Sequence, residues 1–281
     1  MHNRETILLV GHGSRHQPGN REILKFCDQW RERHPAWSIE VCFIELASPL
    51  LDAGLDAAAA HAGTVIVVPL ILNAAGHVKV EIPEYLEQAR QRHPRTTFVY
   101  ASHLGVNDTV LQILKRNLQQ RMQQLDMPDP KTTGVILLGR GSSDRAANGE
   151  LAKMTRWLFE ESEHDLVELA FTGVTHPRVE SVVRRQISLG MSQIIVLPYY
   201  LFTGTLMERI KRQLNHLTVQ YPHVRFSLAG YFGFEEEVFA LLDERVSEVR
   251  GEGGERQPLV CDGCSFRQAA HHTHHHHGSQ I

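Results

Sequence analysis

ILLVGHGS at residues 7–14 decides the fold, because the chain returns to nearly the same phrase as VILLGRGS at residues 135–142. Each copy is an apolar run that ends in two glycines flanking one basic residue. Three further blocks recur in the same order, 128 or 129 residues apart: 43–49 with 171–177, 65–70 with 194–199, and 101–105 with 229–233. This separation is too long for a solenoid repeat and suits a small domain, so the sequence predicts two related units.

Short runs rich in β-branched residues alternate with longer stretches of helical periodicity. The first half predicts strands at 7–10, 39–44, 65–70 and 97–101, with helices at 20–33, 50–62, 79–92 and 107–125. The second half predicts matching strands near 135–138, 166–171, 194–199 and 225–229. Continuously apolar strands that alternate with helices are typical of a parallel sheet covered on both faces. The expected fold is α/β: two tandem, doubly wound parallel-sheet lobes of flavodoxin-type topology that face a central cleft.

Composition also suggests where the units begin and end. The first lobe is expected over residues 1–127, followed by the polar, proline-rich linker Asp126–Pro130. The second lobe is expected over residues 132–250. From Gly251 the chain becomes rich in Gly and Glu and loses its periodicity, so residues 251–281 are expected to form an irregular tail.

Several classes of function are excluded by composition. The chain has 29 Lys and Arg residues and 32 Asp and Glu residues, which gives a net charge of −3. It therefore lacks the excess of basic residues that is typical of nucleic-acid-binding proteins. The longest apolar run, 65–72, contains Pro69 and is too short to span a bilayer. The first residues show no signal-peptide pattern, and four cysteines in 281 residues make no disulfide framework. A cytoplasmic protein is expected.

Residues with metal-binding chemistry stand at the carboxyl ends of the predicted strands. His12 follows the first strand, Glu45 the second and His77 the third. In doubly wound folds these strand ends meet at one crevice. Two imidazoles and one carboxylate form an open site for a divalent metal. The second copy has lost the whole set and carries, in the corresponding places, Arg140, Gly173 and Leu206.

Each of these residues also has a purely structural interpretation. His12 could cap the following helix or contact an anion, Glu45 could be a solvated edge carboxylate, and His77 lies in a small-residue loop that opens a helix. The segment Gly11–Ser14 resembles an anion-binding helix start, with Arg15 and His16 beside it. It lacks the lysine of a phosphate loop, so a carboxylate is the anion that it suits better.

Three segments carry a resemblance to a known family: LLVGHGSR at 8–15, VPL at 68–70 and AGHVKVEIP at 75–83. They resemble the class II sirohydrochlorin chelatases, above all the long, internally duplicated cobaltochelatases. The likeness extends over residues 5–245. It implies ATP-independent insertion of Co²⁺ into sirohydrochlorin, with release of the pyrrole protons, during anaerobic-type cobalamin biosynthesis.

The resemblance implies roles for named residues. The metal ligands and catalytic groups of the family match His12, His77 and Glu45. A neutral imidazole binds a divalent ion, exchanges protons near pH 7 and leaves positions open for pyrrole nitrogens. Sirohydrochlorin carries carboxylates around its rim, which helix starts and cationic side chains bind well. The expected substrate contacts are Gly13, Ser14, Arg15, Lys79 and Arg140.

The tail holds Cys261 and Cys264 in a C-x-x-C, followed by a His-rich tract at 271–277. Some long cobaltochelatases end in such a segment linked to an iron–sulfur cluster, which implies a [4Fe–4S] cofactor here. Two cysteines supply half of the thiolates that such a cluster needs. The alternatives are a cluster shared across a homodimer, a mononuclear site with tail histidines, and no metal at all. The His tract predicts a metal reservoir, with a purification tag as the alternative.

Two other classes of function compete with the chelatase. A histidine phosphatase or mutase also places a His beside glycine after its first strand, yet it needs an Arg just before that His, where Val10 and Gly11 stand. A metallochaperone or metal store would bind Co²⁺ or Ni²⁺ without changing a tetrapyrrole. Within the family, iron or nickel insertion is the alternative to cobalt, because first-row ions bind His sites in an order set mainly by the metal.

Overall fold

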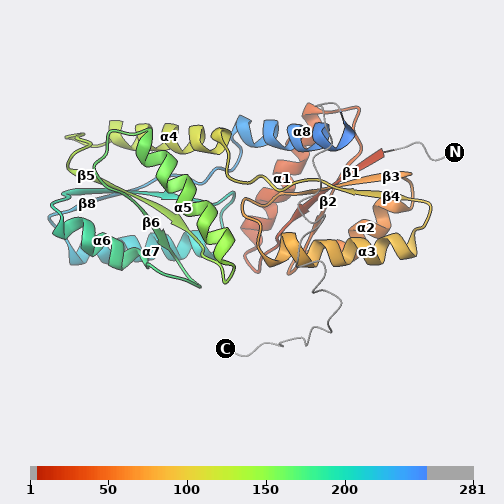
Figure 1. Ribbon diagram of the computed structural model, residues 1–281, viewed down its shortest axis with the longest axis horizontal. Helices are drawn as coiled ribbons and strands as arrows, with labels where there is room; N and C mark the ends of the chain where they lie inside the picture. The colour runs from red at the N-terminus through yellow and green to blue at the C-terminus, as the bar shows by residue number, and fades with distance from the viewer. Residues whose placement is uncertain (1–4, 252–281) are drawn as a thin grey trace.

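The apolar runs of the two repeats form two separate parallel sheets of four strands each (Figure 1). The computed structural model describes residues 5–251. The first sheet has the order β2-β1-β3-β4 and the second the order β6-β5-β7-β8, so the two sheets share one topology. The strands are β1 (Glu5–Gly11), β2 (Ile39–Phe43), β3 (Thr64–Pro69), β4 (Thr97–Tyr100), β5 (Thr133–Gly139), β6 (Val167–Phe171), β7 (Gln193–Pro198) and β8 (Arg225–Leu228). The predicted α/β fold with two tandem lobes is confirmed.

Helices connect the strands and cover both faces of each sheet (Figure 1). Their bounds are α1 (Gln17–Arg33), α2 (Leu51–Ala59), α3 (Ile82–Arg92), α4 (Asp108–Gln123), α5 (Arg145–Glu160), α6 (Val179–Ser188), α7 (Thr205–Gln220) and α8 (Glu236–Arg250). A five-residue π-helix, η1 (His77–Glu81), leads directly into α3. The sequence predicted one helix from residue 79, whereas helical structure begins at His77 with this wider turn.

Strands β1 and β3 are buried on both faces, which explains why their sequences read as continuous apolar runs. On one face of the first sheet, Leu8, Val10 and Val67 pack with residues of α2 and α3. On the other face, Ile7 and Leu9 belong to a larger core that includes residues of α1 and α8. Because all strands of each sheet pair in parallel, their carboxyl ends lie at one edge of that sheet, where the loops that follow the strands gather.

The last helix of each repeat covers the sheet of the other repeat (Figure 1). Helix α4 ends the first repeat and lies against β7, whereas α8 ends the second repeat and lies against β3. Phe239 of α8 stacks on Phe26 of α1 with ring centroids 4.1 Å apart. Trp30 Nε1 donates a hydrogen bond to Asp243 Oδ1 at 2.8 Å. The two repeats thus exchange their last helices, and each lobe in space contains one helix from the other repeat.

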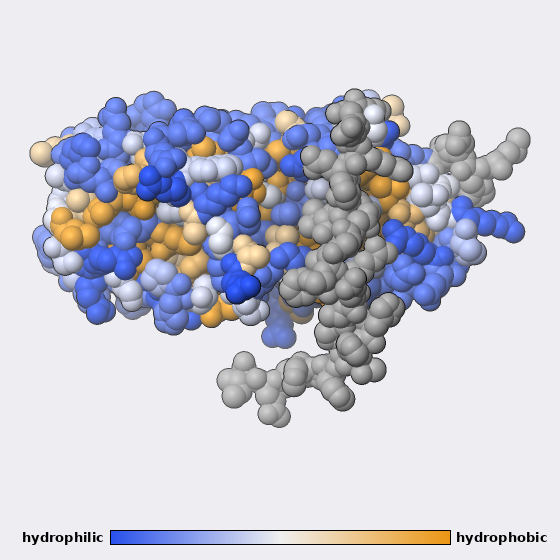
Figure 2. Space-filling model, viewed as in Figure 1, coloured by the Kyte–Doolittle hydropathy of each residue, from blue (hydrophilic) through white to orange (hydrophobic). Residues whose placement is uncertain are grey.

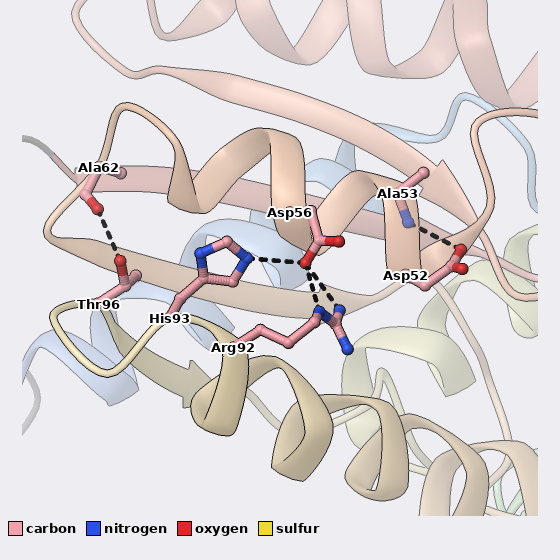
Figure 3. Close-up of polar contacts among 7 residues, drawn as sticks. All are labelled: Asp52, Ala53, Asp56, Ala62, Arg92, His93 and Thr96. Carbon is pink, nitrogen blue, oxygen red and sulfur yellow. Dashed lines mark hydrogen bonds and ion pairs between the residues drawn. The ribbon is translucent and has the colours of Figure 1, made fainter.

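A cluster of charged residues on the outer side of the first lobe ties α2 to the end of α3 (Figure 3). Asp56 Oδ1 accepts hydrogen bonds from Arg92 Nη2 at 2.7 Å and His93 Nε2 at 2.8 Å. Partial burial opposes ionisation of Asp56, but these two donors prevail and lower the pKa of its carboxyl. Each of these charged residues has a partner within the lobe, so the cluster links α2 to the end of α3.

Polar residues cover most of the face seen in Figure 2, and apolar residues come through in scattered groups. None of the described helices is both long and apolar enough to cross a bilayer.

Candidate metal centre

Three connections from the first sheet bring two imidazoles and a carboxylate together. His12 directly follows β1, Glu45 lies two residues beyond β2, and His77 begins η1 after β3. The rings of His12 and His77 meet edge to face with centroids 4.6 Å apart. His12 Nδ1 lies 3.7 Å from Glu45 Oε1. One donor atom from each residue lies within 4.8 Å of the others, a spacing that a shared metal ion could bridge after small side-chain rotations.

The imidazole of His12 is arranged to stay neutral. Its Nδ1 lies 2.9 Å from the carbonyl oxygen of Gly13 and donates a hydrogen bond to it. Burial lowers the pKa of His12, and the charges of His77 and Arg140 lower it further, against the opposing effects of the Gly13 carbonyl and Glu45. Nε2 is buried and has no hydrogen-bond partner among the described residues. A neutral ring with an unused lone pair on a buried nitrogen is a ready metal ligand.

His77 is held by a carboxylate one helical turn away. Its Nδ1 lies 2.5 Å from Glu81 Oε2, and both residues line the same cavity. A carboxylate that accepts a hydrogen bond from one nitrogen of an imidazole fixes the tautomer of the ring. The other ring nitrogen is then free to bind a metal. Glu81 was not among the residues predicted to form the site. Its spacing of four residues from His77 on a predicted helix was the available signal.

The backbone around the site is tightly packed. Gly13 has a φ of +85°, and a Cβ placed there would stand 1.7 Å from the carbonyl oxygen of Glu45. Only glycine lets the loops after β1 and β2 approach this closely. The next residue along the second loop, Leu46, has a φ of 60°, as does its counterpart Val174 in the second lobe. Left-handed backbone at non-glycine residues is uncommon and gathers at functional sites.

The cleft between the lobes contains a cavity of about 750 Å³, within the range that encloses an organic ligand. His12, Glu45 and His77 stand on its first-lobe wall, and residues of the second lobe form the opposite wall. Apolar side chains lie between these polar groups on both sides, including Leu46, Leu72, Val174 and Phe202. The cavity thus combines a broad apolar surface with a compact group of metal-binding side chains.

The predicted substrate contacts divide into two groups. Gly13, Ser14 and Arg140 line the cavity, whereas Arg15 and Lys79 lie outside its lining. Lys79 Nζ instead bridges the lobes through a 2.6 Å ion pair with Asp144 Oδ2 at the start of α5, and this contact lowers the pKa of Asp144. Lys79 thus joins the two lobes in this structure, and contact of Lys79 or Arg15 with the substrate stays a prediction. Cys261 and Cys264 lie outside the described residues.

Glu81→Ala is expected to weaken Co²⁺ binding by about tenfold to a hundredfold, because His77 loses the partner that orients its ring. Calorimetric titration of the tetrapyrrole-free protein with Co²⁺ measures the dissociation constant. Glu84→Ala, in the first turn of α3, is the matched control and is expected to bind like the unmodified chain. An unchanged affinity in Glu81→Ala would remove this residue from the metal centre.

The His12 ring is expected to titrate below pH 6.5, the value of an unperturbed histidine. Burial disfavours the charged form, so at pH 6.5 this imidazole remains mostly neutral while a solvated one is half protonated. Histidine-selective NMR of the metal-free protein, recorded from pH 8 to pH 5, follows the ring directly. A midpoint at or above 6.5 would contradict the proposed electrostatics.

Comparison with known proteins agrees with the fold and identifies the family. A family model described as CbiX matches the chain twice, over residues 6–121 and 134–249. A sirohydrochlorin cobaltochelatase of Priestia megaterium is 39% identical over 95% of this chain and 86% of that protein. A sirohydrochlorin ferrochelatase of the same species is 30% identical over 89% of this chain and 92% of that protein.

A solved structure has the same architecture. SirB from Bacillus subtilis with Fe³⁺ superposes with a TM-score of 0.76 at 28% identity, covering 90% of this chain and 99% of that one. The resemblance predicted from the histidine-containing segments is confirmed. The chain belongs to the CbiX family of sirohydrochlorin chelatases and carries the family's module twice.

Proposed function

We propose that this protein inserts Co²⁺ into sirohydrochlorin without ATP, as a step of cobalamin biosynthesis. The observation that carries the proposal is the convergence of His12, Glu45 and His77 on one wall of a cavity large enough for an organic ligand. The preference for cobalt rests on the cobaltochelatase that is 39% identical over nearly the whole chain.

Metal insertion makes two demands that these residues meet. The metal must be held with coordination positions left open, and two His with one carboxylate leave such positions for pyrrole nitrogens. The macrocycle must also lose its two inner N–H protons as its nitrogens bind the metal. A ring nitrogen that gives up the metal to the pyrrole nitrogens regains its lone pair and can take up one of these protons, and Glu45 is a further base beside it; the protons then pass to water at the open mouth of the cleft. No nucleotide is needed, because metal–nitrogen bonding drives the exchange.

Iron insertion is the second candidate function. The ferrochelatase that is 30% identical over most of this chain supports it. A site of two imidazoles and one carboxylate binds Fe²⁺, Co²⁺ and Ni²⁺ in an order set by the ions themselves, so the ligands alone favour none of the three as the physiological substrate. The [4Fe–4S] cluster on Cys261 and Cys264 stays a prediction from the sequence.

The test is a spectroscopic assay with each metal. Purified protein is mixed anaerobically with sirohydrochlorin and Co²⁺, Ni²⁺ or Fe²⁺, and the visible spectrum is followed against a protein-free control. The expected result is insertion of all three ions above the background rate, with the highest kcat/KM for Co²⁺. A higher kcat/KM for Fe²⁺ would make the protein a ferrochelatase. Metal binding without any spectral change would overturn the chelatase proposal in favour of a metal store.

A further inference from the structure

Leu46 and Val174 occupy equivalent places on the two walls of the cavity. Leu46 follows Glu45, and Val174 follows Gly173, the residue that stands in the place of Glu45. Both line the cavity, and they are 47% and 59% exposed. Neither is part of the hydrophobic cores formed within residues 5–251. Burial inside the protein therefore does not explain why both side chains are apolar.

The backbone at both positions disfavours a side chain. The φ of each residue is 60°, in the left-handed region. The amide of Thr175 donates a hydrogen bond to the carbonyl oxygen of Gly173 at 2.6 Å, which closes a γ-turn centred on Val174. A γ-turn with positive φ is rare and strained, and a β-branched residue such as valine is an outlier there. Because glycine adopts such backbone without this cost, the presence of a side chain at each position needs a reason.

Close packing of two loops enforces this backbone in both lobes. A Cβ on Gly13 would stand 1.7 Å from the carbonyl oxygen of Glu45. In the second lobe, a Cβ on Gly141 would stand 2.5 Å from the carbonyl oxygen of Gly173. The loop after the first strand of each sheet thus presses on the peptide that precedes the strained residue. This packing holds an apolar side chain at the cavity wall in each lobe.

The strained apolar residue is kept in both lobes although the metal-binding residues are not. The second lobe has no counterpart of the same kind for His12, Glu45 or His77. It still has Val174 with the same φ as Leu46 and with its side chain in the cavity lining. The arrangement therefore serves something other than metal binding. What the two walls share is the ligand enclosed between them.

We propose that Leu46 and Val174 are substrate-positioning residues that pack against the two opposite faces of the macrocycle. The identity of the ligand rests on the proposed function. A tetrapyrrole has broad apolar faces and carries its carboxylates on the rim, so apolar side chains on the two walls gain free energy by removing these faces from water. Contacts from both sides hold the plane of the ring beside His12 and His77, where its nitrogens meet the metal.

Shortening both side chains tests the contact. The double variant Leu46→Ala, Val174→Ala of the full chain is expected to bind metal-free sirohydrochlorin at least about tenfold more weakly, because several apolar carbon groups are lost from the contact. The double variant Leu189→Ala, Val219→Ala is the matched control, since it carries the same substitutions at exposed residues outside the cavity lining. Absorbance titration with sirohydrochlorin gives the dissociation constants.

Val174 allows contact with the substrate to be separated from metal binding, because it lies on the wall opposite His12, Glu45 and His77. Val174→Ala is expected to raise the KM for sirohydrochlorin severalfold, while its Co²⁺ affinity, measured without tetrapyrrole, stays unchanged. Val174→Thr keeps the branched shape and adds a hydroxyl group, and it is also expected to bind sirohydrochlorin more weakly. Unchanged binding in both variants would contradict the contact at the second-lobe wall.

Glycine at position 46 tests whether the side chain serves binding or the fold. Leu46→Gly removes the side chain and relieves the strained backbone, whereas Leu46→Ala keeps the Cβ and most of the strain. The Gly variant is expected to melt at a higher temperature than the Ala variant, and both are expected to bind sirohydrochlorin more weakly than the unmodified chain. A Leu46→Gly protein that melts well below the unmodified chain yet binds sirohydrochlorin normally would assign Leu46 to the fold and overturn its role in binding.

The outcomes separate this inference from the proposed function. If the unmodified protein inserts metal but the cavity double variant binds sirohydrochlorin within about twofold of its control, the positioning role is overturned and the chelatase stands. If the unmodified protein binds sirohydrochlorin through Leu46 and Val174 yet inserts no metal, the proposed function fails while the positioning role stands. If the unmodified protein does not bind sirohydrochlorin, both fail.

Discussion

His12→Ala is expected to lower kcat/KM for metal insertion by at least about a hundredfold, with little change in the stability of the fold. The variant loses the proposed metal ligand Nε2, which is buried and has no other partner among the described residues, and with it the nitrogen that can take up a proton once the metal has left. The ring is partly exposed at the cleft and makes only a backbone hydrogen bond at Nδ1, so its removal leaves the core unchanged. The sirohydrochlorin assay measures the rate, and calorimetry measures Co²⁺ binding.

A histidine away from the site provides the control for this prediction. His61 pairs with Glu40 at 2.8 Å on the opposite edge of the first sheet and is half exposed. His61→Ala is expected to keep the full insertion rate. A His12→Ala protein that inserts metal as fast as the unmodified chain would remove this residue from the mechanism and leave His77 and Glu45 to be tested alone.

Phe239→Ala is expected to lower the free energy of unfolding by about 3–5 kcal/mol, the usual cost of deleting a buried aromatic side chain. Phe239 is 1% exposed and stacks on Phe26, which is fully buried in the first lobe. Although Phe239 belongs to the second repeat, the loss is expected to fall on the first lobe. Urea denaturation measures the free energy, and amide hydrogen exchange shows which strands lose protection.

Val219→Ala is the control for this change, because Val219 is 82% exposed at the end of α7. Its effect on the free energy of unfolding is expected to stay within about 0.5 kcal/mol. Faster hydrogen exchange in β5 and β7, with β1 and β3 unchanged, would contradict the packing of α8 on the first sheet.

The strands and the meeting of the three metal-binding residues were predictable from the sequence. Buried parallel strands are recognisable in a sequence as continuous apolar runs. The carboxyl ends of such strands lie at the same edge of the sheet. His12, Glu45 and His77 each follow a different strand of the first sheet, so their convergence needed no knowledge of side-chain packing. The duplication added a further signal, because the second copy lacks all three residues.

The exchange of α4 and α8 was not predictable in the same way. Both helices show an apolar face at helical spacing, and that pattern indicates burial without naming the sheet that is covered. The Lys79–Asp144 pair between the lobes depends on this three-dimensional arrangement and not on spacing along the chain. The π-helical turn over residues 77–81 was not predictable either, because sequence periodicity does not distinguish it from an ordinary helix.

The reciprocal exchange of α4 and α8 makes the ancestral duplication hard to undo. A single repeat produced alone would expose one apolar face of its sheet and leave its last amphipathic helix without a sheet to pack on. Two copies could avoid this by exchanging these helices in a dimer. In the duplicated chain each half depends on the other for the packing of its sheet. Residues that line the cleft in one half can therefore change while α4 and α8 still hold the two lobes together.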